Sequence, residues 1–337
     1  MDCAALVSRA KEIRDRHKRV FACPAEMDGK MHWQQLAGGL MLRISKEERR
    51  SSGIYAPMRQ RTYWAFAAGF LFMGAVSSRA ADPNEIVQRA TAAFRSDWEA
   101  DPSYACIEKD EVQKGDKLTS KTFEVVMIDG SDYRLPLATD GQPLLPARRK
   151  AELIKLKDEA ERRKNESPSA RHSRIAGWKK QRDENGELLL DFPTSLTFHF
   201  VREEIKDGQG AYVFSAVPRP GVIATTRAAK VLTGIQGSAW VDKDSLHPMR
   251  IKCNVVRPVP VYGALASVLP GTDIEITMTK VSDSTWLIDL VSLKLKVAKI
   301  VLFKSEVLTR YTYSDYRPND SVLQELLTEA SRAQLGD

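Results

Sequence analysis

The sequence predicts an α+β, mainly β fold, in which one curved antiparallel sheet or unclosed β-barrel of about 9–11 strands is covered by a few helices. Two observations predict this class. Short runs that alternate apolar and polar residues recur from Tyr104 to Tyr316, and polar turns separate them at regular spacing. Helical patterns are confined to the two ends of this region, to 226–232 and to one charged segment at 147–182.

The clearest strand pair is a hairpin in the middle of this region. Residues 238–242 form the first strand, the polar residues 243–248 form the turn, and 249–256 return. In the returning strand, Met249 and Ile251 alternate with charged residues, which is the period of a strand with one buried face.

The other elements follow from the same patterns. Asp82-Pro83 caps a helix that runs to about Trp98. Further strands are predicted at 104–112, 119–128, 133–137, 197–201, 212–217, 274–278, 286–304 and 307–316. The run 286–304 is long for one strand and is expected to bend or bulge, and a last helix is expected from Asn319 to about Ala333.

Residues 147–182 form a charged insert with 13 Lys and Arg against 5 Asp and Glu. Residues 147–164 are predicted to be helical, and a stretch rich in Ser, Pro and Arg follows. Two interpretations stay open. The insert is either a mobile basic arm that contacts an anionic membrane surface or an acidic protein partner, or a solvated helix over one edge of the sheet.

The N-terminal 80 residues are predicted to lie outside the fold. Residues 58–80 have the layout of a secretory signal peptide, with a basic start, a short apolar core and small residues before a cleavage site between Ala80 and Ala81. An uncleaved anchor is the alternative. Residues 1–57 are interpreted as an over-extended N-terminus, and 81–337 as one domain that is exported to the periplasm or secreted.

Removal of residues 1–80 would change the charge of the chain. The whole sequence has 51 Lys and Arg and 44 Asp and Glu, and residues 1–80 hold 14 and 7 of these, which leaves 37 of each sign. A balanced charge gives no support for binding nucleic acid. We therefore expect no nucleic-acid partner.

The sequence contains no residue pattern of a known catalytic or metal site. It lacks the G-x-S-x-G, H-E-x-x-H, Walker and G-x-G-x-x-G patterns, and the histidines after residue 80 are scattered. We expect no enzyme activity, no metal and no cofactor. Cys106 and Cys253 could form a disulfide in an oxidising compartment or stay as two separate buried thiols.

The remaining candidate site is apolar. A single-layer sheet has an inner face that few helices are available to cover, so an uncovered groove could bind an apolar ligand. A fully packed core would use the same residues, and the sequence does not decide between the two. The candidates for the inner face are Phe198, Phe200, Trp240, Met249, Ile251, Ile274, Ile276 and Met278.

Two short motifs carry a family resemblance. The hairpin reads Gly237-x-x-Trp240-Val-Asp242 followed by Pro248-x-Arg250-Ile251, and a late strand ends in Tyr313-x-Asp-Tyr316. In this order of elements, the chain resembles the periplasmic lipoprotein-localisation carrier superfamily (LolA/LolB-like), which includes outer-membrane lipoprotein carriers and sigma-factor regulators. The charged insert is not part of the carrier pattern.

The resemblance implies an unclosed barrel with a helical lid and a cavity for acyl chains, without catalysis. The first hypothesis is therefore an envelope protein that binds a lipid or the acyl chain of a lipoprotein, by burial of apolar area. The alternative is an interaction or sensor module with a filled core, which binds a protein partner through residues 147–182.

Overall fold

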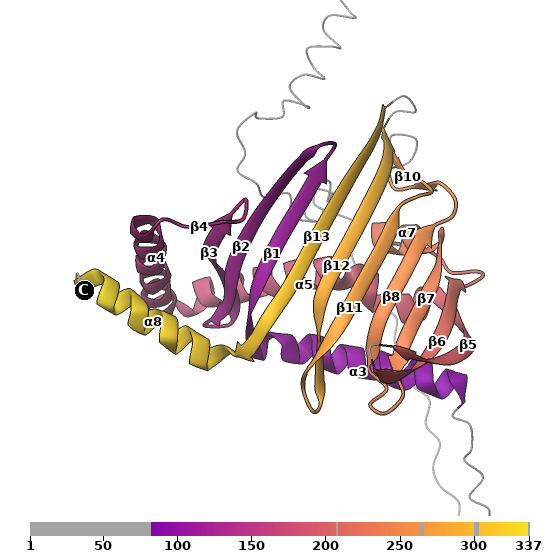
Figure 1. Cartoon of the computed structure of the whole chain (residues 1–337), viewed down its shortest axis with the longest axis horizontal. Coiled ribbons are helices and arrows are strands. Elements are labelled where there is room, and N and C mark those ends of the chain that lie inside the picture. Colours follow the sequence, from indigo (N-terminus) through magenta and orange to yellow (C-terminus); the bar gives the residue numbers. More distant parts are fainter. Residues whose placement is uncertain (1–81, 207, 263–265, 300–302, 336–337) are drawn as a thin grey trace, which may run out of the picture. The chain divides into compact units, whose positions relative to one another are not determined.

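The computed structural model describes residues 82–206, 208–262, 266–299 and 303–335. The predicted signal peptide at 58–80, its cleavage site between Ala80 and Ala81, and residues 1–57 lie outside this part of the chain. The described residues form one antiparallel sheet with the strand order β4-β3-β2-β1-β13-β12-β11-β8-β7-β6-β5 (Figure 1). The end strands β4 and β5 do not pair with each other, so the sheet is unclosed and the predicted fold class is confirmed.

The strands are β1 (Tyr104–Lys114), β2 (Lys117–Ile128), β3 (Ser131–Thr139), β4 (Gln142–Pro143), β5 (Leu196–Lys206), β6 (Gln209–Pro218), β7 (Ile235–Asp242), β8 (Pro248–Val255), β9 (Val259–Pro260), β10 (Ala266–Val268), β11 (Asp273–Ser282), β12 (Thr285–Lys299) and β13 (Phe303–Pro318). These 13 strands exceed the expected number of about 9–11 because β4, β9 and β10 are pieces of two or three residues that the turn-based prediction passes over. The predicted strand 286–304 is also corrected. Strand β12 ends at Lys299, and β13 already begins at Phe303.

The helices in the described residues are α3 (Pro83–Ala100), α4 (Pro146–Lys164), α5 (Pro168–Leu190), α6 (Phe192–Ser195), α7 (Arg227–Leu232) and α8 (Asn319–Leu335), with a single 3₁₀ turn, η1 (Asp101–Ser103). Helix α3 begins as the sequence predicts, because the Asp82 side chain accepts a hydrogen bond from the Asn84 amide and Pro83 takes the first helical position.

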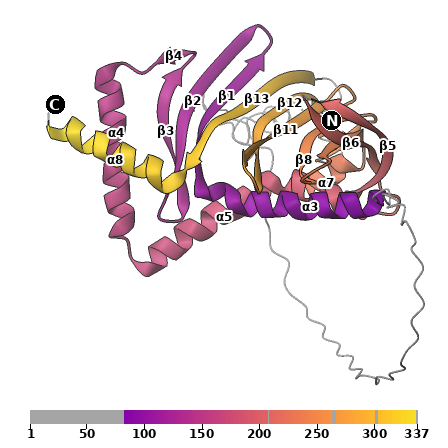
Figure 2. The same cartoon turned by 60° about the horizontal axis from the view of Figure 1, so that its bottom comes forward.

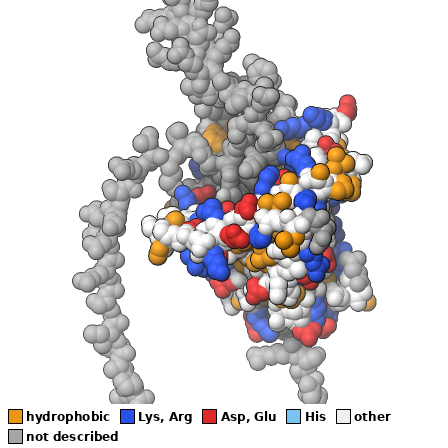
Figure 3. Space-filling model, turned by 90° about the vertical axis from the view of Figure 1, so that its left-hand side faces the viewer, with side chains coloured by type: hydrophobic (Ala, Val, Ile, Leu, Met, Phe, Trp, Pro, Cys, Tyr) orange, Lys and Arg blue, Asp and Glu red, His pale blue; other side chains and the backbone are white. Residues whose placement is uncertain are grey.

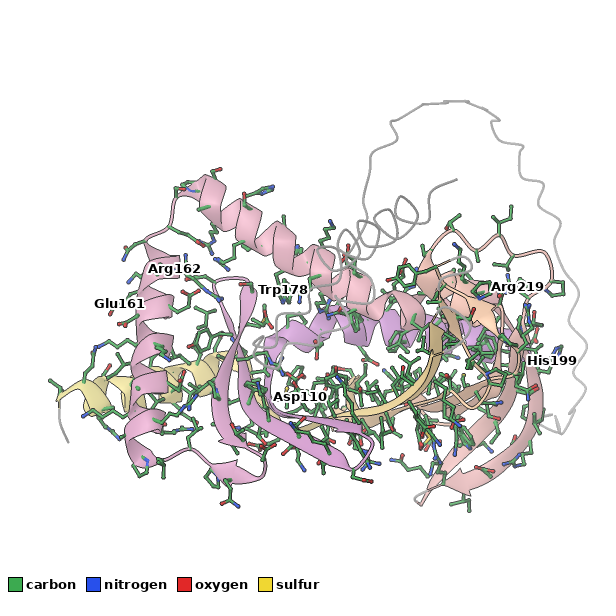
Figure 4. The ribbon with its side chains drawn as sticks, turned by 90° about the horizontal axis from the view of Figure 1, so that it is seen from above. Asp110, Glu161, Arg162, Trp178, His199 and Arg219 are labelled. Carbon is green, nitrogen blue, oxygen red and sulfur yellow. The ribbon has the colours of Figure 1, made fainter. Side chains whose placement is uncertain are left out.

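The two faces of the sheet differ in chemistry, and the strand register shows how. Ile276 lies opposite Ile251 and Val291, and Ile274 lies opposite Cys253 and Leu293, so these side chains share one face. The residues between them point the other way and are largely charged: Arg250, Lys252, Glu275, Lys294, Lys296, Glu306 and Arg310. The apolar face is the concave one, toward α3 and α5 (Figures 2 and 4).

Helix α3 covers the concave face at β5–β8 and reaches the start of β12. Its Ile86 and Ala90 pack in one cluster with Phe214 of β6 and Val241 of β7. Near the other end of the helix, the buried Asp97 carboxylate accepts a hydrogen bond from the Trp286 amide at 3.1 Å, which ties the helix to the start of β12. Its second oxygen lies 3.5 Å from His247 Nε2, in the turn before β8.

Helices α4 and α8 cover the opposite, outer face at strands β1–β3. Leu153 and Leu156 of α4 and Val322 and Leu326 of α8 pack in one cluster with outward-facing residues of the sheet, such as Leu135. The helix predicted at 147–164 is therefore confirmed, and it is not a free arm because its apolar stripe is buried against the sheet.

Helix α5 is not predicted by the sequence pattern. The stretch that begins at Pro168 is too polar to show a helical stripe, and Gly186 and Leu189 are its buried residues. The helix is instead held by two arginines in its interior. Arg174 pairs with Glu166 and donates to Ser131 and Asp129 at the β2–β3 turn, and Arg182 donates to the Trp98 carbonyl of α3. Polar contacts to neighbouring elements, rather than an amphipathic pattern, place this helix.

Arg163 fastens α4 to the β2–β3 turn, and its loss should destabilise the fold. Its buried guanidinium donates to the carbonyls of Ile128 at 2.9 Å and Ser131 at 2.8 Å. We expect Arg163→Met to lower the free energy of unfolding by about 2 kcal/mol, because buried carbonyls lose their donor. The control Arg162→Met removes an exposed pair with Glu159 and should leave the free energy of unfolding nearly unchanged. Equal urea midpoints for the two variants would contradict this assignment.

Candidate functional site

The apolar concave face is covered unevenly, and this defines the candidate site. Inward side chains of β8 and β11 are buried, among them Met249, Ile274 and Ile276. Further along the sheet Leu293 of β12 is also buried, but four inward apolar side chains of β12, β13 and β1 around it are half-buried: Val291, Leu295, Val307 and Val112. We call these four residues the apolar stripe. None of the four belongs to the cluster in which α3 packs on the sheet.

The structure brings most of the predicted site residues together, but mainly as core. Ile274, Ile276, Met249 and Met278 are 2–7% exposed, and Ile251 is half-buried beside them. Phe198 joins the cluster under α3. Phe200 lies at the edge strand, 43% exposed, with its ring edge-on to Phe214 at 5.9 Å between centroids.

The prediction that Trp240 faces inward is corrected, because this residue lies on the outer face. It is paired with Arg250, while its neighbour Ala239 is paired with the inward Ile251. The indole nitrogen donates to Glu204 at 2.6 Å, and the Arg250 guanidinium lies 5.3 Å from the ring centroid. These polar partners cover the ring and allow a large aromatic side chain to lie on the solvent side. Its size alone favours the inner face, which is why the sequence prediction is wrong at this residue.

One polar cluster interrupts the concave face next to the apolar stripe. Arg134 of β3 donates to Asp110 Oδ2 at 2.8 Å and lies 3.0 Å from Glu108 Oε2, both on β1. Its guanidinium also stacks over the Phe123 ring at 4.1 Å. The side chains of Glu108, Asp110 and Arg134 are 13–21% exposed, and Figure 4 places Asp110 between the sheet and helices α3 and α5.

The environment of this cluster shifts its protonation. Burial raises the pKa of Glu108 to about 8, Arg134 opposes that shift, and Asp110 adds to it. Burial and the same two carboxylates raise the pKa of Tyr311 on β13 to about 12. Asp110 Oδ1 is buried without a hydrogen-bond partner, so a protonated Glu108 carboxyl is the group at hand to donate to it.

The sequence shows Glu108 and Asp110 but not their role. Glu108 and Asp110 lie at alternate positions of β1, on the same face as Cys106. Charged residues at alternate positions are usually assigned to the solvent face. Arg134 comes from β3, which meets β1 only across β2. The placement of all three on the inner face depends on the register of three strands.

Cys106 and Cys253 are free thiols and do not form the disulfide that the sequence allows. Cys106 lies on β1 and Cys253 on β8, and three strands separate these two in the sheet. At about 4.8 Å per strand step, their separation far exceeds the reach of a disulfide. Burial raises the pKa of Cys253 to about 12, so this thiol stays protonated.

The insert 147–182 carries many bases, but most of them are already paired. Arg149 pairs with Glu329, Lys155 with Glu152, and Arg171 with Asp129; Arg162 and Arg163 both contact Glu159. Figure 3 shows Lys and Arg side chains interspersed with Asp and Glu on the side of the molecule formed by α4 and α8. In Figure 4, Glu161 and Arg162 lie on the outer side of α4.

A groove of about 460 Å³ lies between α3 and α5. Its wall includes Trp98 of α3 and Trp178 of α5, and the Arg182 guanidinium lies between the two rings, 4.1 Å and 5.8 Å from their centroids. Arg182 therefore joins the two helices that border the concave side.

Catalytic and metal chemistry gains no support from the described residues. No group of three or more His, Cys, Asp or Glu within the described ranges could hold a metal ion. No helix in that part of the chain is long and apolar enough to cross a membrane.

No protein-family model matches the sequence, and no curated protein matches it. Solved structures do. A DUF1329 family protein from Desulfovibrio piger is 12% identical, with a TM-score of 0.30 over 70% of this chain and 92% of its own. A LolA superfamily protein from Nitrosomonas europaea is 11% identical, with a TM-score of 0.29 over 71% and 96%. A putative outer membrane lipoprotein-sorting protein domain from Vibrio parahaemolyticus is 12% identical, with a TM-score of 0.28 over 70% and 99%.

Lipoprotein-sorting and LolA superfamily proteins are thus among the solved structures that this chain is similar to. They belong to the superfamily that the two sequence motifs also resemble. These identities and TM-scores carry no argument about function, which has to be inferred from this chain's own residues.

Proposed function

We propose that the protein is a non-catalytic carrier of the cell envelope that binds a lipid, or the acyl chain of a lipoprotein, on the concave face of its sheet. One observation carries the proposal. The inward side chains of the apolar stripe are only half-buried, although the sheet curves around them and helices α3 and α5 lie on the same side (Figure 4). An apolar chain laid along the stripe would gain about 0.8 kcal/mol for each methylene removed from water.

The site divides into a packed half and an open half. On β5–β8 and β11 the concave face is filled by its own side chains and by α3. The predicted residues Ile274, Ile276 and Met249 would therefore be part of the core beside the site and would not contact the ligand. The open half lies at β12, β13 and β1. An acyl chain there would have the Arg134–Asp110 ion pair at its side, which offers polar contacts to a head group.

The export signal predicted at 58–80 supports an envelope location for this carrier. The alternative function, docking of a partner through the insert 147–182, is less well supported. The bases of this segment are largely engaged with acids of the same chain, and α4 is packed on the sheet. An already neutralised surface attracts an acidic partner weakly.

A charge placed in the apolar stripe tests the proposal. Leu295 is half-buried on the concave side of β12. We expect Leu295→Glu to weaken the binding of a dansyl-labelled fatty acid at least about tenfold, because an apolar contact worth two methylenes is lost and a carboxylate is introduced. Fluorescence titration measures the dissociation constant.

The matched control is Lys294→Glu, which introduces the same side chain one residue earlier, on the outer face, where Lys294 pairs with Glu306. This variant should bind the probe as the unsubstituted chain does. If neither the unsubstituted chain nor the control binds the probe, the carrier proposal fails. If both variants bind equally, the ligand does not lie on the stripe.

A further inference from the structure

Strand β5 ends the sheet and leaves one long edge without a strand partner among the described residues. It pairs with β6 alone. Edge strands normally avoid exposed apolar side chains, because the free main-chain groups beside them can pair with another chain. Here four large apolar side chains gather on β5 and β6: Phe200, 43% exposed, Val201, 50%, Ile205, 81%, and Val217, 37%. His199 marks this strand, far from α4 (Figure 4).

The free main-chain groups of β5 can be placed from its pairing with β6. Lys206 pairs with Gln209 across a tight turn, and bonded and non-bonded pairs alternate along an antiparallel ladder. Glu204, opposite Ala211, is then a bonded pair, whereas the N–H and C=O groups of Ile205 and Glu203 point toward the free edge. Val201 has no partner residue on β6 because the register shifts between Phe200 and Arg202, and the alternation along β5 gives its main-chain groups the same direction as those of Glu203 and Ile205, toward the free edge.

The side chains along this edge are self-complementary: a second copy of β5, running antiparallel to the first, would place matching side chains opposite one another. In an antiparallel pair centred on Glu203, Val201 lies opposite Ile205 of the second copy, and this contact occurs twice. Arg202 lies opposite Glu204 of the second copy, also twice. Within one copy these two residues already form an ion pair at 2.5 Å, so their charged ends lie on the same face of the strand.

The centre of such a pair brings two Glu203 residues together. The repulsion between the two Glu203 carboxylates is reduced because the Lys243 ammonium pairs with Glu203. This ammonium also lies 5.3 Å from the centroid of the Tyr212 ring. Each carboxylate therefore brings its own counter-charge to the contact.

We propose that β5 pairs antiparallel with β5 of a second copy of this chain about a two-fold axis at Glu203, which joins two sheets into one. Backbone hydrogen bonds from Val201, Glu203 and Ile205 would hold the two copies together. The Val201–Ile205 contacts would bury exposed apolar surface, and the Arg202–Glu204 pairs would set the register. This interface is independent of the lipid site proposed on the concave face.

The test is analytical ultracentrifugation of the full chain. We expect a dimer, and we expect Ile205→Lys to raise its dissociation constant at least about tenfold, because two charges would face the Val201 contacts. Ile223→Lys is the matched control, since Ile223 is as exposed but lies outside the strand, and it should leave the dimer intact.

A cysteine at the axis tests the register. Bonded partners in an antiparallel pair have Cα atoms about 5.5 Å apart, which is within the reach of a disulfide. Glu203→Cys should therefore be cross-linked into a dimer by mild oxidation, whereas Ile223→Cys and the unsubstituted chain should not. A monomeric full chain, a dimer that survives Ile205→Lys, or a Glu203→Cys variant that does not cross-link would each overturn the proposal, and the first of these would direct attention to a strand from another protein.

Discussion

Gly237→Ala is expected to lower the free energy of unfolding by about 3 kcal/mol, because the space between β7 and β8 at this residue is too narrow for a Cβ atom. A Cβ atom at Gly237 would lie 2.2 Å from the Lys252 carbonyl oxygen and 2.6 Å from Cys253 Sγ. The first of these atoms belongs to the main chain of the paired strand and cannot turn aside as a long side chain would. The two strands of the hairpin would have to move apart, which would also separate the paired inward residues Ala239 and Ile251.

The matched control is Gly177→Ala in α5, where a Cβ atom would meet nothing within 4 Å. Alanine is favoured over glycine inside a helix, so this variant should be stabilised by about 0.5–1 kcal/mol. Urea unfolding followed by circular dichroism gives both values. Similar midpoints for the two variants would show that the β7–β8 contact relaxes easily and that close strand packing does not require a glycine in the hairpin motif.

The second large effect is a loss of stability as the pH rises. The pKa of Glu108 is raised to about 8 in the folded chain, mainly by burial, whereas an unfolded glutamate titrates near 4.5. Between these values the folded state holds a proton that the unfolded state has released. The stabilisation is therefore complete below about pH 4.5 and is lost as the pH rises to about 8, on the order of 5 kcal/mol in total.

Glu108→Gln should flatten this dependence. The amide keeps the size of the side chain and a donor for Asp110, and it does not titrate. Unfolding free energies measured from about pH 5 to about pH 8.5 should fall for the unsubstituted chain and stay nearly level for the variant. Glu275→Gln, which removes a carboxylate from the outer face, is the control and should keep the slope. A slope that persists in Glu108→Gln would mean that another group carries it.

The sequence by itself determined the class of the fold and the approximate positions of its longer strands. Alternation in 249–256 and 274–278 identified Met249, Ile251, Ile274 and Ile276 as one inward row, and the register confirms that Ile251, Ile274 and Ile276 share a face. This is possible because the period of two along a strand is a local property, which neighbouring residues set without reference to the rest of the chain.

The tertiary structure decided which large side chains face the interior. Trp240 is expected inside because aromatic residues are usually buried, but its parity places it outside, where Arg250 and Glu204 cover it. The same holds for α5, which has no apolar stripe and is positioned by Arg174 and Arg182. Contacts between residues that are distant in sequence leave no periodic signal.

The candidate site also depends on long-range pairing. Strand β1 lies beside β13, whose paired residues come more than 190 positions later in the chain, and Arg134 reaches Glu108 and Asp110 across β2. Residue types and periodicity showed an apolar face, and the family resemblance added the expectation of an acyl ligand. Only the sheet order showed that α3 fills one half of this face and leaves the stripe on β12, β13 and β1 half-buried, since the packing of a helix on a sheet is decided by shape in three dimensions.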